Sequence, residues 1–160
     1  PPGEYSSDLF SDKLIECHQG DGRPFFTYLA FTVPHFPLQA PPALIEKYMG
    51  RDTDGWDAPG RRRFERMQAQ GLAPPDRTLP TRIAEVPDWG GLSDEARAVE
   101  SKKMAIYAAM VDNLDSNVGR VLGLLEELGE SDNTSFVFLS DIGTNPYDRN
   151  TRPIYAAYQE

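Results

Sequence analysis

Residues 25–31 form a short apolar run that is stopped by a proline-rich loop, in the stretch PFFTYLAFTVPHFPLQAPP. The run is rich in aromatic residues and too short for a typical helix, so it predicts a central β-strand buried on both faces. His35 follows between Pro34 and Pro37, whose rings restrict the backbone and present the imidazole from a stiff loop. Because open α/β sheets bind ligands beyond the carboxyl ends of their strands, His35 is a candidate site residue.

Four helices are predicted along the chain, and the clearest one starts at Ser93. Ser93 is a favourable N-cap, and the acidic residues that follow it complement the positive end of the helix. Apolar residues from Met104 to Leu128 then recur every three or four positions, which is typical of a long helix packed on a sheet. Together with a second apolar run at 135–139, this order predicts an α/β fold of parallel strands covered by helices. The predicted helices span residues 5–20, 41–48, 58–70 and 93–129.

The second predicted strand ends in the sequence Ser140-Asp141-Ile142-Gly143. If the two strands are parallel, their carboxyl ends share one edge of the sheet, and His35 and Asp141 face a common cleft. A carboxylate at a strand end suits Ca²⁺ or Mg²⁺, and a nearby histidine suits an anionic substrate or general acid catalysis. A turn aspartate and an ordinary loop histidine explain the same residues equally well. The pattern alone therefore indicates a metal and an anion, with the reaction undefined.

Composition excludes some classes of function. The formal charge of −9 and the pI near 4.7 argue against electrostatic binding to nucleic acid, and the basic patch at 61–63 reads as a solvated helix face. No apolar run approaches membrane-spanning length. Cys17 is the only cysteine, so an internal disulfide is excluded, and a half-buried unreactive thiol is expected. The chain begins at Pro1 without a methionine, which favours an internal piece of a longer protein and leaves the compartment open.

The segment 50–91 is polar and rich in proline and glycine, which predicts a surface excursion over the site. Trp56 and Trp89 are expected to pin this excursion down by packing rather than to line a substrate pocket. The polar side chains at 112–115 resemble metal ligands in composition. Their position within the long helix favours a solvated or interhelical polar face instead.

Four stretches, taken together and in this order, resemble the middle of a bacterial arylsulfatase, a type I sulfatase of the alkaline-phosphatase superfamily. The similarity covers residues 5–143, and the PHxPLQAP loop and the VDxxDxxVGRVLxxL helix are its most specific parts. It implies a fragment of an alkaline-phosphatase-like sandwich, with residues 1–143 as a partial catalytic domain and 144–160 as a divergent tail. The stretches are FFTYLAFTVPHFPLQAPP, KYMGRDTDGWDAPGRRRFERMQAQGL, KKMAIYAAMVDNLDSNVGRVLGLLEELGESDNT and FVFLSDIG.

This resemblance implies a calcium-dependent hydrolase that acts on small-molecule sulfate esters. The family's nucleophile is a formylglycine made from a cysteine or serine in a C/S-x-P-x-R motif. His35 matches the histidine that contacts the substrate sulfate, and Asp141 matches an aspartate that ligates the calcium ion. A cation and a preorganised donor both stabilise charge on a transferred sulfuryl group.

The sequence also departs from the family pattern. Ile142 replaces an asparagine that also contacts the metal, and Cys17 lies in ECHQG, which is not the formylglycine motif. The amino-terminal aspartate pair and the later sulfate-binding lysine are absent as well. The chain is therefore expected to be inactive alone, and to expose apolar surface or associate. Two alternatives remain open: a phosphonate or phosphate ester hydrolase of the same superfamily, and a non-catalytic remnant or binding module.

Overall fold

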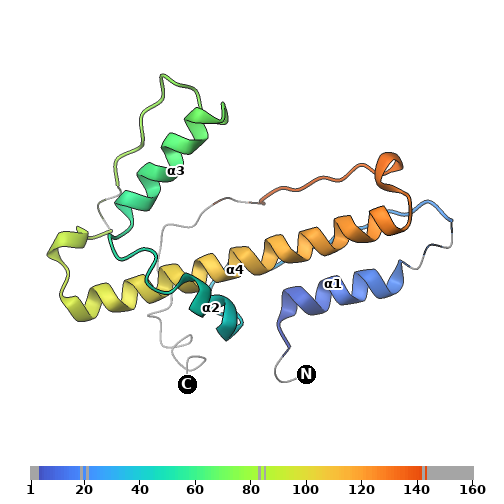
Figure 1. Ribbon diagram of the computed structural model, residues 1–160, viewed down its shortest axis with the longest axis horizontal. Coiled ribbons are helices and arrows are strands. Elements are labelled where there is room, and N and C mark those ends of the chain that lie inside the picture. Colours follow the sequence, from blue (N-terminus) through green and yellow to red (C-terminus); the bar gives the residue numbers. More distant parts are fainter. Residues whose placement is uncertain are drawn as a thin grey trace.

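The computed structural model describes residues 4–18, 20, 22–82, 84, 86–141 and 143, which form a helical assembly around one long helix (Figure 1). All four predicted helices are confirmed, with bounds that differ from the expected ones by a few residues at most. The helices are α1 (Ser6–Cys17), α2 (Pro42–Tyr48), α3 (Asp57–Ala69) and α4 (Asp94–Glu127), with short 3₁₀ turns η1 (Trp89–Gly91) and η2 (Ser131–Asn133).

Helix α4 begins and ends where its sequence signals predict. The Ser93 hydroxyl accepts a hydrogen bond from the Ala96 backbone N–H at 3.2 Å, so it caps the first turn. In that turn, hydrogen bonding of the Glu95 carboxylate to its own backbone N–H, and then to Ser93, lowers the pKa of Glu95. Gly129 follows the helix with a φ of +71°, which is a conformation that glycine adopts without strain and that commonly ends helices.

Helix α4 packs against both α1 and α2, and its seam with α1 is largely polar. Asn113 and Asn117 of α4 are buried and both donate to the Asp8 carboxylate of α1, at 2.9 and 2.7 Å. Ser7 and Ser11 of α1 are completely buried on the same seam. The polar residues of this part of α4 therefore serve helix packing, as expected for an interhelical face.

Helix α3 projects from the rest of the assembly, and the chain that follows returns along it (Figure 1). Gln68 ties the returning chain to the helix through hydrogen bonds to the carbonyls of Pro74, Pro75 and Arg77, at 3.1, 3.3 and 3.0 Å. At the base of this arm the Trp56 and Trp89 rings pack edge to face, with centroids 5.0 Å apart. The two tryptophans thus have the packing role that was expected of them.

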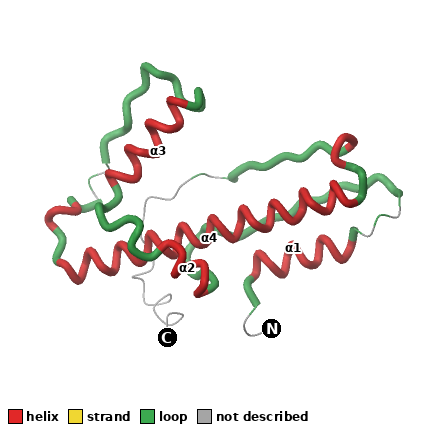
Figure 2. The backbone as a smooth tube through the Cα atoms, viewed as in Figure 1, coloured by secondary structure: helices red, strands yellow, loops and turns green. Residues whose placement is uncertain are grey.

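The two predicted strands do not form. Figure 2 shows only helices and loops in the described part of the chain, although residues 23–32 and 134–140 run extended. We name these the first and second extended segments. A β-strand is defined by its hydrogen-bonded neighbours, and among the described residues neither segment has one. The predicted α/β sandwich of parallel strands is therefore not seen among the described residues, because the two apolar runs have no strand to pair with there.

The chain consequently buries little apolar surface. Its accessible area is 11935 Å², whereas a compact protein of 17.9 kDa exposes roughly 8000 Å². Phe26 is 92% exposed and Val137 75% exposed, both within the extended segments. Exposed apolar surface was expected from the sequence and is present. Among the described helices, none has the combination of length and apolar composition that crossing a bilayer requires.

Candidate functional site

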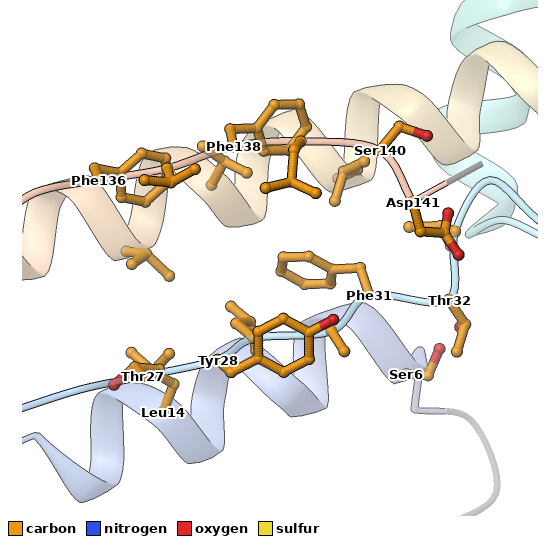
Figure 3. Close-up of a pocket in the computed structure, with 18 of the residues that line it drawn as sticks. Ser6, Leu14, Thr27, Tyr28, Phe31, Thr32, Phe136, Phe138, Ser140 and Asp141 are labelled. Carbon is orange, nitrogen blue, oxygen red and sulfur yellow. The ribbon is translucent and has the colours of Figure 1, made fainter. Parts of the chain in front are cut away.

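A large cleft lies between the two extended segments, with one face of α4 along it (Figure 3). The first extended segment passes beside α1, and the second beside α4, so the cleft has an apolar wall on each side. Its volume is about 2480 Å³. Apolar side chains of α4 and of its C-cap line it: Met104, Tyr107, Met110, Leu114, Val118, Val121, Leu124, Leu125 and Leu128.

The two extended segments run in the same direction along this cleft. In Figure 3 the chain passes from Thr27 to Thr32 on one side and from Phe136 to Asp141 on the other, so both carboxyl ends lie at the same end of the cleft. Residues 40–99 do not contribute to the described lining. The expectation that the 50–91 excursion lies over the site is therefore wrong, because α3 carries that segment away as an arm.

His35 lies in the loop beyond the first extended segment and lines the cleft. Its backbone N–H donates to the Thr32 carbonyl at 3.1 Å, and the peptide bonds before Pro34 and Pro37 are both cis. The ring nitrogen Nδ1 lies 2.6 Å from the Phe36 carbonyl oxygen, a distance at which it must carry a proton and donate. The neutral ring therefore offers Nε2 as an acceptor, and only the imidazolium offers a donor there. The side chain is exposed and accessible to a ligand.

Asp141 directly follows the second extended segment and lines the same cleft. The Ser140 hydroxyl beside it accepts from the Gly143 backbone N–H at 3.1 Å, which closes a tight turn. Gly143 has a φ of +71°. Ile142, between them, lies outside the described residues. The turn exposes the Asp141 carboxylate at the rim.

His35 and Asp141 thus line one cleft, on loops that leave it at the same end. Cys17 also lines the cleft, but near the start of the first extended segment. It is exposed, so the half-buried thiol expected from the sequence is a wrong prediction. Its position at the end of α1, rather than within the α1–α4 seam, accounts for this.

Comparison with known proteins identifies the family. The sulfatase family matches this chain over residues 1–159. The chain belongs to the sulfatase family. An arylsulfatase of Klebsiella aerogenes is 34% identical over 148 residues, which are 91% of this chain and 32% of that enzyme. An uncharacterized sulfatase of Schizosaccharomyces pombe is 39% identical over 143 residues, 87% of this chain and 26% of the relative.

This sulfatase chain spans about a third or less of the length of these curated relatives. A third relative, a multifunctional alkaline phosphatase superfamily protein of Trinickia caryophylli, is 27% identical over 150 residues, 89% of this chain and 28% of its own length. The predicted divergent tail, residues 144–160, lies outside the described residues.

The described residues do not make a complete calcium site. Calcium takes six to eight oxygen ligands in proteins. In the described ranges no group of three or more acidic, histidine or cysteine side chains is placed to hold a metal ion. A sulfatase metal centre built on Asp141 would need further ligands from outside these residues.

Sequence reasoning missed His18, the only other histidine, which lines the opposite end of the cleft. Its Nδ1 lies 3.1 Å from the Leu14 carbonyl, and its Nε2 lies 3.0 Å from the Thr27 hydroxyl. The ring also packs edge to face on Phe25. His18 therefore holds the start of the first extended segment on the end of α1. The one signal in the sequence was that His18 lies within ten residues of the aromatic run that starts at Phe25. Such spacings are too common in proteins to predict a contact.

Proposed function

We propose that this chain is the part of a sulfuric ester hydrolase that supplies one substrate-binding residue, His35, and one metal ligand, Asp141. The observation that carries the proposal is that both residues line one cleft, in a chain of the sulfatase family. The arylsulfatase relative supports a sulfate ester as the substrate class. By itself the chain is inactive, because the formylglycine motif is absent from its sequence.

In this role His35 binds an anionic ester oxygen through Nε2. Because Nδ1 donates to the Phe36 carbonyl, the imidazolium is the form that donates from Nε2 to the anion. The hydrogen bond to the Phe36 carbonyl also fixes the ring orientation, so the donor is positioned before the substrate arrives. Such preorganised donors stabilise developing charge more than mobile ones do. A bound divalent cation would supply further charge stabilisation at the same oxygens.

The test of His35 uses a chimera in which this chain replaces the matching third of the Klebsiella aerogenes arylsulfatase. His35→Gln should lower kcat/KM for an aryl sulfate roughly 10²–10³-fold, as expected for the loss of one preorganised donor. His18→Gln is the matched control, because His18 lines the other end of the cleft and serves packing. Equal losses in both variants, with native circular dichroism, would show that His35 has no role of its own.

The test of Asp141 is calcium binding by the same chimera, measured by isothermal titration calorimetry. Asp141→Asn should weaken binding strongly, whereas Asp132→Asn, on η2 at the other end of the second extended segment, should leave it unchanged. Ile142→Asn should strengthen binding, because an amide oxygen is a calcium ligand and an isoleucine side chain is not. Calcium binding that neither Asp141→Asn nor Ile142→Asn alters would overturn the assignment of Asp141.

A second candidate activity, hydrolysis of phosphate or phosphonate esters, is favoured by the Trinickia caryophylli relative, whose name places it in the alkaline phosphatase superfamily. Sulfate and phosphate esters share a tetrahedral anionic centre, so a histidine donor and a cation suit both. Comparing kcat/KM for an aryl sulfate, an aryl phosphate and an aryl phosphonate in the same chimera separates these candidates. A chimera that folds and binds calcium but hydrolyses none of them would support a non-catalytic remnant instead.

A further inference from the structure

One side of the α3 arm carries a group of exposed arginine side chains. Gln68 marks the other side, because it ties the returning chain to the helix through three hydrogen bonds. At 3.6 residues per turn, Arg62, Arg63 and Arg66 lie away from Gln68 around the helix. All three are exposed to solvent. We name these three residues the arginine face.

Two of the three arginines carry a charge that no described side chain neutralises. Arg62 pairs with Asp54 at 2.6 Å and lies 3.7 Å from Asp52, so it serves the base of the arm. Within the described ranges neither Arg63 nor Arg66 forms an ion pair. A guanidinium group presents its donors in a planar fork and binds oxyanions through paired hydrogen bonds. The arginine face is therefore suited to an anionic ligand.

The arm is positively charged, whereas the chain as a whole is acidic. Residues 57–82 hold six arginines and three acidic residues, which is a formal charge of +3, although the whole chain carries −9. The other residues therefore carry −12 in total. A polyanion is attracted to the arm and repelled by this remainder, so its contact is confined to the arginine face.

The arm is attached near the end of the cleft at which Asp141 lies. Figure 1 shows that α3 rises beside the amino-terminal half of α4, and that the second extended segment runs back along α4 toward that half. Just before the arm, the Asp52 carbonyl accepts a hydrogen bond from the Ser101 hydroxyl of α4 at 3.3 Å. Glu100 and Lys103, which neighbour Ser101 on α4, line the cleft. The base of the arm is therefore close to the cleft.

The arginine face is separated from the cleft by part of the length of the arm. Helix α3 begins at Asp57 and rises 1.5 Å per residue, so the positions from Arg62 to Arg66 are roughly 8–14 Å from its base. A small aryl sulfate in the cleft does not extend over that distance. A ligand that occupies both places has to be a longer molecule that carries anionic groups at intervals.

We propose that the arginine face is a second substrate-binding site, which holds sulfate groups of a sulfated polysaccharide while another of its sulfate esters lies in the cleft. This inference rests on the function proposed above, because it names the substrate class of that same site. Membership of the sulfatase family favours sulfate over other anions. The hydrogen bonds of Gln68 and the ion pair of Arg62 hold the arm in place, so the arginine face is ordered before the polymer binds.

Inhibition of aryl sulfate hydrolysis by dextran sulfate tests the proposal in the Klebsiella chimera. Arg63→Gln/Arg66→Gln should raise the inhibition constant of dextran sulfate about 2–30-fold, as expected for the loss of two exposed ion pairs. Arg63→Lys/Arg66→Lys keeps the charge and should raise it less. Glu65→Gln is the matched control on the same helix and should lower it, because it removes a negative charge. An unchanged inhibition constant in the glutamine double variant, or an equal rise in Glu65→Gln, would overturn the proposal.

Binding by the isolated chain provides a second test, which does not depend on catalysis. A chimera that hydrolyses no sulfate ester would contradict the proposed function, whereas this test concerns the arginine face alone. Fluorescence anisotropy of labelled dextran sulfate should report binding at low salt that weakens as salt is added. The glutamine double variant should bind more weakly, with native circular dichroism. Equal binding by parent and variant, or tighter binding of a DNA duplex by the parent, would overturn the assignment. So would a dimer that dissociates in the variant, because a second copy would then occupy the arginine face.

Discussion

Asn117 of α4 donates a hydrogen bond to the Asp8 carboxylate of α1 at 2.7 Å, across 109 positions of sequence. Asn117 is 1% exposed and also lies within hydrogen-bond distance of the Asn113 backbone carbonyl, at 2.9 Å. A buried amide with these partners is directional, so it fixes the register of α1 along α4 as well as their contact. Leu or Ala at this position would allow the two helices to slide.

Replacing Asn117 tests this seam. Asn117→Ala should lower the free energy of unfolding by about 1–3 kcal/mol, because the half-buried Asp8 carboxylate loses one of its donors. Asn117→Asp should be more destabilising still, since it sets two carboxylates against each other. Urea denaturation of the isolated chain measures both. Lys13→Ala, which removes an exposed pair with Glu16 on the outer face of α1, should leave the free energy of unfolding nearly unchanged. A seam variant that behaves like Lys13→Ala would contradict the role given to Asn117.

The cap of α4 can be tested at Ser93. Ser93→Ala removes the acceptor for the Ala96 N–H and should cost about 1 kcal/mol of stability. Ser131→Ala is the control, because no side-chain cap hydrogen bond serves the short turn in which Ser131 lies. Thermal unfolding followed at 222 nm compares the two. A loss in Ser131→Ala as large as that in Ser93→Ala would point to a general effect of serine removal.

Gly55 is required at the base of the α3 arm for two separate reasons. It has a φ of +86°, and a Cβ atom there would lie 2.5 Å from Cγ of Trp89. Gly50 has a φ of +75° but open space around it, so it separates the two effects. Gly50→Ala should cost about 1–2 kcal/mol from backbone strain alone. Gly55→Ala should cost a further 1–3 kcal/mol, because Trp89 must move, and should change tryptophan fluorescence. Equal costs for the two variants would mean that Trp89 yields freely.

Tyr5 links the start of α1 to the loop that carries His35, through a hydrogen bond to the Gln39 carbonyl at 2.7 Å. Burial of the phenol, and then the negative charge of Asp8, raise the pKa of Tyr5 above its usual value of 10.0. The folded state therefore holds the proton more tightly, so this contribution to stability is present below pH 10 and is lost as the pH rises through the raised pKa.

Tyr5→Phe should accordingly be about 1 kcal/mol less stable than the parent chain at pH 8. The difference between the two should shrink as the pH rises above 10, because the ionised phenolate cannot donate. Tyr28→Phe, whose side chain is 82% exposed, should match the parent at both pH values. A Tyr5→Phe difference that is constant from pH 8 to pH 11 would show that the hydroxyl contributes nothing to folding.

The sequence predicted the helices well because their signals are local. Ser93, the acidic first turn and Gly129 mark the ends of α4 within a few residues of each boundary. The strands could not be predicted in the same way. The apolar run at 25–31 indicates a high propensity for β-strand, but a strand forms only where a neighbouring strand is present to pair with it. The same limit applies to Asn113 and Asn117. From sequence alone these polar residues could equally face solvent, and only the packing of α1 shows that they are buried.

One part of the candidate site could be predicted, namely the shared chain direction of the two apolar runs. Both extended segments run the same way along the cleft, so Thr32 and Asp141 lie at the same end of it, and His35 lines the same cleft. The exposed position of Cys17 was not predictable, since it depends on where α1 ends relative to the cleft. The destination of the 50–91 excursion also depended on the packing of Trp56 against Trp89, which no local pattern specifies.

The α1–α4 seam uses only side chains from within these 160 residues, whereas a neighbouring face of α4 borders a cleft. On a ribosome, the helical side can therefore assemble as soon as α4 has emerged, without help from other parts of the polypeptide. The apolar residues from Phe25 to Phe31, in the first extended segment, then remain exposed beside helices that have already packed together. Transiently exposed apolar surface of this kind makes folding intermediates prone to aggregation.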